Sequence, residues 1–224
     1  MSYADRVIQG IVGLDRRQIE GQYMSPALSR QGAAITLDWL TQLAIDGRTF
    51  HAQQGDAVTL VNFAETAYDE DQPQFALTVP QGTTVIPLSI DINLQDAAGT
   101  DTHIVVSTTT NDIGDGTSTA ATISAMRRDA PYSSQCSAWS LYTGNATAAT
   151  GLIEIARVLD PFAAASGHGI LGLHWNARNA SAIPVLVGPA TLQWHIVATS
   201  TAPQGFSELI FAELQTPDLV RLSS

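Results

Sequence analysis

Five histidines are the first candidates for chemistry in this sequence. They are His51, His103, His168, His174 and His195. None forms a His-x-His pair or the His-x-x-x-His spacing that places two imidazoles on one face of a helix. A metal site built from His168 and His174 is an alternative, but we expect His103 and His195 to be ordinary strand residues. The sequence predicts no metal site and no cofactor.

The motifs of common enzymes are missing as well. A serine hydrolase with a nucleophile elbow needs Gly-x-Ser-x-Gly, and the chain has no such segment. All ten basic residues are arginine, so the lysine of a phosphate-binding loop has no candidate. The single cysteine, Cys136, lies in an alternating run with Ala138, which predicts a small buried residue and excludes an internal disulfide. We predict no catalytic residue and no enzymatic activity.

Charged and aromatic groups offer contacts with another protein instead. The candidates outside the N-terminal region are Asp69, Glu70, Asp71, Arg127, Arg128 and Trp175. The acidic run could collect a divalent cation at a subunit contact, or it could be a solvated turn. The arginine pair could bind the acidic run of another copy, or Asp129 could compensate it locally. Trp175 is the best candidate for an exposed or interface tryptophan.

Charge is scarce and unevenly distributed along the chain. Charged residues make up 14% and hydrophobic residues 45%, so a sizeable core is available and the surface is poor in charge. Residues 1–48 contain five arginines and five acidic residues, and residues 49–224 therefore carry the whole net charge of −11. An acidic body disfavours direct nucleic-acid binding. In the N-terminal region, Arg16, Arg17 and Arg30 could dock on an acidic neighbour.

The N-terminus shows no pattern of a secretory signal, and no run approaches the ~20 apolar residues of a membrane span. We expect a protein that is made in a cytoplasm and does not enter a membrane. Residues 1–30 sustain neither a helix nor a strand period, and we expect residues 1–48 to form an irregular N-terminal arm. Residues 32–46 fit either a strand, through Ile35, Leu37 and Trp39, or a helix, through Leu37, Leu40 and Ala44.

From Phe50 onward, short apolar runs alternate with polar turns, which predicts antiparallel strands. The expected strands are Phe50–Gln53, Val58–Phe63, Gln74–Val79, Thr84–Leu94, Thr102–Thr108, Ser134–Tyr142, Gly151–Val158, Ile170–Arg178, Ile183–Leu186, Thr191–Ser200 and Ser207–Leu214. Ten or so strands without a strong helix after residue 46 predict an all-β jelly roll or β-sandwich over residues 49–224.

Two details within these strands make sharper predictions. In the Thr84–Leu94 strand, the even positions from Ile86 to Leu94 are expected to share one apolar face, and Pro87 predicts an edge, a bulge or a corner. In Thr191–Ser200, the even positions are expected to form the apolar face. Asn111–Ala121 and Pro161–Gly169 are expected to be long loops.

Four segments carry a resemblance to a known group of proteins. They are Tyr68–Leu88, Arg127–Pro131, Ile183–Pro189 and Pro203–Phe206. With them, the chain from about residue 50 to 214 resembles uncharacterised structural proteins of tailed bacteriophages, including jelly-roll capsid cement (decoration) proteins. The resemblance implies a virion protein that clamps the major capsid protein as a homotrimer. It implies no catalytic residue.

The sequence therefore favours a capsid cement protein whose partners are the major capsid protein and further copies of itself. One structural alternative is a small jelly-roll major capsid protein, and another is a tail or receptor-binding protein. A carbohydrate-binding β-sandwich is the alternative from a different class.

Overall fold

A computed structural model of the chain describes residues 39–56, 58–63, 67–94, 101–129, 132–144, 147–160, 171–180, 182–198 and 202–216. The chain divides into two compact units, residues 1–46 and 47–224. In the first unit, the described part is the helix α1 (Trp39–Ile45), after which the amide of Asp46 donates to the carbonyl of Gln42 (2.9 Å). The helical alternative for residues 32–46 is therefore correct over α1. The expected arm up to residue 38, with Arg16, Arg17 and Arg30, lies outside the described residues.

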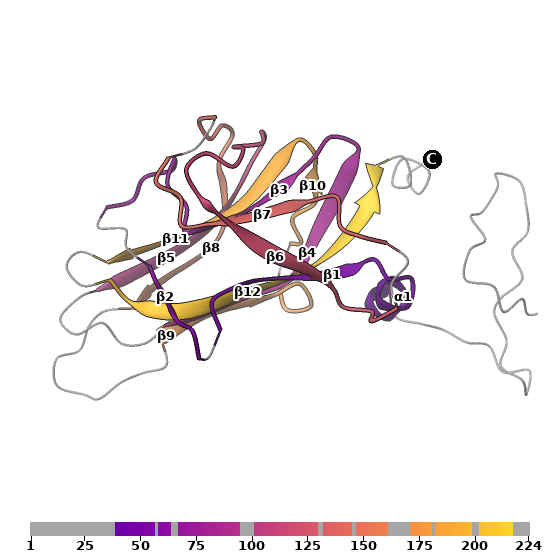
Figure 1. Ribbon diagram of the computed structural model, residues 1–224, viewed down its shortest axis with the longest axis horizontal. Helices are drawn as coiled ribbons and strands as arrows, with labels where there is room; N and C mark the ends of the chain where they lie inside the picture. The colour runs from indigo at the N-terminus through magenta and orange to yellow at the C-terminus, as the bar shows by residue number, and fades with distance from the viewer. Residues whose placement is uncertain are drawn as a thin grey trace, which may run out of the picture. The chain divides into compact units, whose positions relative to one another are not determined.

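The described part of the second unit consists of strands and their connections (Figure 1). The strands are β1 (Thr49–Gln54), β2 (Val61–Asn62), β3 (Phe75–Val79), β4 (Thr83–Leu94), β5 (Thr102–Thr109), β6 (Thr119–Ala125), β7 (Ser137–Ser140), β8 (Ile153–Asp160), β9 (Leu171–Asn176), β10 (Leu186–Val187), β11 (Ala190–Ala198) and β12 (Gln204–Gln215). Each expected strand overlaps one of these, although β2, β7, β9 and β10 are clearly shorter than predicted. The expected loop Pro161–Gly169 lies outside the described residues.

The strands pair in the nested order of a jelly roll. Working inward along the chain, β1 pairs with β12, β3 with β11, β4 with β9 and β5 with β8, all antiparallel. Strand β12 also pairs with β4, and β11 also pairs with β5, so these two strands connect the nested pairs to one another. All twelve described strands are connected in one sheet, in which β10 also pairs with β4 and β2 with β12. Within it, we call β1, β12, β4 and β9 the β12 sheet, and β3, β11, β5 and β8 the β11 sheet. The all-β jelly-roll prediction is confirmed.

The connection between β5 and β8 joins the two sheets along one side. Its strand β6 pairs with β7 through residues 119–121 and with β1 through residues 122–125, and β7 pairs with β3. A strand that leaves one sheet for another forms a corner of the sandwich. The prediction of a loop over Asn111–Ala121 is therefore wrong at its last three residues, and β6 itself was missed. Its sequence Thr-Ala-Ala-Thr-Ile-Ser-Ala has too few large side chains to show a strand pattern.

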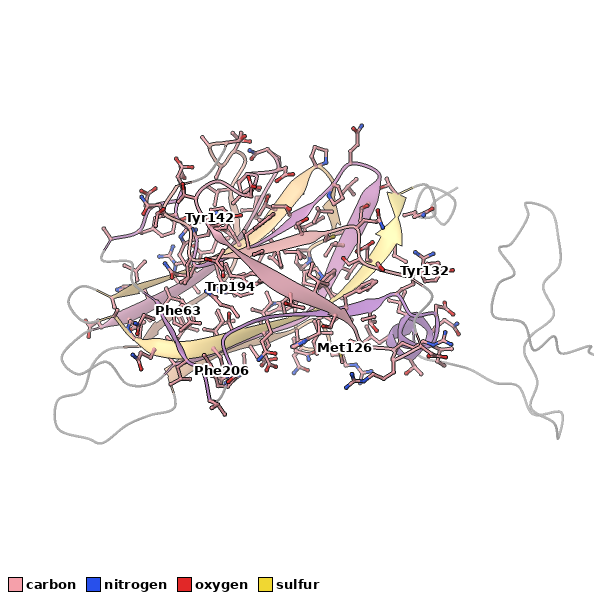
Figure 2. All side chains as sticks on the ribbon, in the orientation of Figure 1. Phe63, Met126, Tyr132, Tyr142, Trp194 and Phe206 are labelled. Atoms are coloured by element: carbon pink, nitrogen blue, oxygen red, sulfur yellow. The ribbon has the colours of Figure 1, made fainter. Side chains whose placement is uncertain are left out.

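The main core fills the space between the sheets, and its largest side chain is Trp194 of β11 (Figure 2). The indole ring stacks on Phe75 of β3, with ring centroids 4.2 Å apart and planes 9° apart. A second cluster covers the opposite face of the β11 sheet, where Ile113 and Tyr142 from two connections pack over Ala76. Every residue of β11 is consequently buried. The expected polar face of this strand is thus a second interior face.

Strand β4 contains a bulge at the proline that the sequence singled out. Ile210 of β12 pairs with Ser89 and Phe211 pairs with Pro87, so Leu88 has no opposite residue in β12. The first two residues of β4, Thr83 and Thr84, are both buried. Beyond them, the buried positions are Val85 and Pro87 before the bulge and Ile90, Ile92 and Leu94 after it. The prediction of a bulge is confirmed. The prediction of one continuous face from Ile86 to Leu94 is wrong for its first two members, because the extra residue reverses the inward parity.

Deletion of Leu88 should be tolerated, because the remaining residues can pair with β12 without interruption and keep their inward parity. We expect a loss of about 1 kcal/mol in the free energy of unfolding, mainly from a half-buried leucine. Deletion of Ile90 is the control, since a one-residue slip there turns core side chains to solvent. Urea unfolding of both variants measures the difference. A Leu88 deletion as damaging as the Ile90 deletion would contradict the assigned bulge.

Candidate functional site

The acidic run forms a tight turn just before β3. One carboxylate oxygen of Asp69 accepts from the amide of Asp71 (3.0 Å), and the other accepts from the side chain of Gln72 (2.9 Å). The carboxylate of Asp71 accepts from the amide of Ala149 (3.1 Å), which ties the turn to another connection. Asp69 and Glu70 are exposed. We call Tyr68–Gln72 the acidic turn.

The acidic turn lies on the covered outer face of the β11 sheet. The ring of Tyr68 packs at a tilt on the imidazole of His195, with centroids 4.8 Å apart, and its other side is open to solvent. The carbonyl of Glu70 lies 3.5 Å from the amide nitrogen of the Gln193 side chain. The turn thus presents an aromatic ring and two carboxylates on a fixed part of the fold.

The arginine pair lies in the turn directly after β6. The guanidinium of Arg127 makes a two-point contact with the carboxylate of Asp129, at 2.8 and 3.0 Å, which lowers the pKa of that exposed carboxyl group. Arg128 points to solvent beside exposed Met126, whose amide donates to the carbonyl of Thr49 (3.0 Å). We call Met126–Asp129 the basic turn. Of the two interpretations of the arginine pair, compensation of the positive charge by Asp129 therefore holds for Arg127.

A cavity of about 410 Å³ opens where β6 leaves β7, because the two strands diverge there. Phe50, Ile123 and Ala138 contribute apolar walls, and Tyr132 lies at the end that the basic turn joins. The guanidinium of Arg48 packs over the Tyr132 ring, 4.2 Å from its centroid. Figure 2 shows Met126 and Tyr132 at the same end of the sandwich. Apolar, cationic and aromatic groups therefore meet at this surface.

One buried carboxylate fixes the segment that forms the cavity wall. Glu213 of β12 is only 6% exposed, and it accepts from the Ser134 hydroxyl (2.6 Å) and from the amide of Gln135 (3.0 and 3.1 Å). We call Tyr132–Cys136 the wall segment. Burial raises the pKa of the Cys136 thiol, and the negative charge of Glu213 raises it further. The sequence analysis missed Glu213, although its inward parity with Phe211 was a signal.

The remaining candidates lie elsewhere. Trp175 of β9 is half-buried and packs against the main core. On the β12 sheet, His174 contacts Asp91 (2.9 Å) and His51 lies 3.9 Å from Glu208. No group of three or more His, Cys, Asp or Glu side chains within the described ranges could hold a metal ion. His168 lies outside these ranges. The arginine pair follows Ala125, which lines the cavity, and the acidic turn lies against the β11 sheet.

Comparisons with protein-family models, with curated proteins and with solved structures gave no match for this chain. In the described part of the chain, no helix is long and apolar enough to cross a membrane.

Proposed function

We propose that this chain is a structural protein of a virion, a capsid cement protein that binds between major capsid protein subunits. The observation that carries the proposal is a row of exposed aliphatic side chains at a sheet edge. Ile183, Val185 and Val187 are 38%, 53% and 51% exposed, whereas Leu186 between the last two is buried. They lie along and just before β10, the terminal strand of the sheet path. We call these three residues the edge row.

An exposed apolar row on an edge strand favours association, because both the side chains and the unpaired backbone can bind a partner. A specific and stable contact buries upward of about 1,000 Å² in total, which a row on a rigid strand can nucleate. The low charge content of the chain supports the proposal, since uncharged surface costs less to remove from water. In this proposal the edge row contacts the shell, and the rest of the jelly roll lies on the outer surface of the shell.

The carbohydrate-binding alternative depended on an exposed tryptophan. Trp175 is half-buried against the core, so this residue gives that alternative no support. The choice between a cement protein and a major capsid or tail protein depends on copy number. Quantitative mass spectrometry of purified virions measures it: hundreds of copies fit cement or capsid, and a few tens at most fit a tail.

Replacing Val185 and Val187 by aspartate should weaken binding to shells at least tenfold, because two charges would enter the apolar contact. Co-sedimentation with shells assembled from the major capsid protein measures this. The control is Val58→Asp, a change at a valine that is 93% exposed and lies outside the edge row. Equal binding by the edge-row variant and the wild type, or absence of the protein from virions, would refute the proposal.

A further inference from the structure

We infer that copies of this chain bind one another, the basic turn of one copy against the acidic turn of the next. The inference deepens the proposed function, since it names the surfaces through which the protein would assemble with itself on a shell. It concerns surfaces other than the edge row. Both turns are formed from residues of the second unit, and each is held by hydrogen bonds within it.

The first support is a pair of unsatisfied charges. Among the residues that the structure describes, Arg128 is exposed and has no hydrogen-bond or ionic partner, whereas the other four arginines each have one. Arg48 packs on Tyr132, Arg127 binds Asp129, Arg157 binds Glu154, and Arg178 is also engaged. The Glu70 carboxylate in the acidic turn is likewise exposed and makes none of the described side-chain contacts. Within the described ranges, Arg128 is thus an unpaired cation on an acidic body, which is suited to an acidic partner surface.

The second support is that each turn combines its charge with exposed apolar groups. Glu70 follows exposed Tyr68 by two residues, and Arg128 follows exposed Met126 by two residues and precedes exposed Tyr132 by four. Exposed ion pairs alone contribute little to binding. An aromatic ring that enters the apolar surface next to the cavity supplies the burial that such a contact needs, while the charges set its orientation.

The third support is the position of the two turns. The acidic turn lies on the outer face of the β11 sheet, and the basic turn follows the half of β6 that pairs with β1 of the β12 sheet. The two turns thus lie against different strands of the fold, and we infer that the contact forms between copies. Two copies can form a symmetric dimer that contains the contact twice, or several copies can form a closed ring in which each basic turn binds the acidic turn of the next copy. The molar mass of the assembly distinguishes the two arrangements.

Sedimentation velocity of the full chain, without shells, tests the inference. We expect the wild type to associate at micromolar concentration and to dissociate in 1 M salt, because the contact is partly ionic. Arg128→Glu should weaken association at least tenfold. Arg178→Glu, the same change at another exposed arginine, should leave it within twofold. A wild type that stays monomeric, or equal effects of the two substitutions, would overturn the inference.

A charge exchange identifies the partner surface. Glu70→Arg alone should also weaken association at least tenfold, whereas Asp115→Arg, at an exposed acid outside both turns, should not. A mixture of the Arg128→Glu and Glu70→Arg chains should regain association, because each supplies the charge that the other has lost. Failure of the mixture to associate would exclude the acidic turn as the partner. A wild type that stays monomeric in solution but binds shells would overturn this inference and leave the proposed function intact.

Discussion

Replacement of Trp194 by alanine should lower the free energy of unfolding by about 3–5 kcal/mol. This indole is fully buried at the centre of the β11 sheet and stacks on Phe75 in near-parallel planes. Its removal leaves a large cavity, and the hydrogen bonds that pair β11 with β3 and β5 on either side restrict the movement that would close it. Urea unfolding followed by circular dichroism measures the change.

Trp194→Phe is the informative control for this prediction. The indole nitrogen is buried, and no acceptor among the described residues bonds to it. Phenylalanine keeps a ring for the stack and removes the unsatisfied donor, whose burial costs about 1–3 kcal/mol. We therefore expect the phenylalanine variant to lie within about 1.5 kcal/mol of the wild type. A loss equal to that of the alanine variant would contradict this account of the core.

The second large effect should come from Glu213. Replacement by alanine leaves the amide of Gln135 and the hydroxyl of Ser134 without their acceptor at a site that is nearly closed to solvent. We expect a loss of about 2–4 kcal/mol in the free energy of unfolding, which urea titration measures. Ser134→Ala removes one of these bonds and should cost about half as much.

The thiol of Cys136 gives an independent measure of the wall segment. Its pKa is held above the ordinary value by burial and by the Glu213 charge, so little thiolate is present near pH 8. Removing that charge and loosening the wall segment both lower the pKa. The Glu213→Ala variant should therefore react with a thiol reagent at least tenfold faster at pH 8. An unchanged rate would mean that Glu213 does not hold the wall segment closed.

The period-2 pattern predicted most strands, because half-buried antiparallel strands show it in their side chains. The pattern failed where tertiary structure changed the alternation of buried and exposed side chains. The parity of β4 reverses at Leu88, which only the opposite strand reveals. Both faces of β11 are buried because distant connections cover the outer one, so the odd positions Gln193 and His195 are as buried as the even, apolar positions. Strand β6 divides its hydrogen bonds between two sheets and needs no apolar face of its own.

The candidate site was predicted in part. The arginine pair and the acidic run are visible as neighbours in sequence, and their local contacts with Asp129 and Gln72 need only short turns. The cavity was not predictable, since its walls come from β1, β6 and the residues before and within β7. Glu213 was missed for the same reason, because its hydrogen-bond partners lie nearly 80 residues earlier in the chain.

The nested pairing also determines how late during synthesis β1 can pair with β12. Thr49 in the first strand lies opposite Ala212 in the last, so β1 has no partner in β12 until more than 160 further residues have been made. At about 5–20 residues per second, translation takes on the order of 10–30 s to supply them. Throughout that interval Phe50 and its strand remain without the sheet that buries them. A ribosome-bound chain that stops before β12 should therefore depend on chaperones, whereas one that includes β12 can complete the roll.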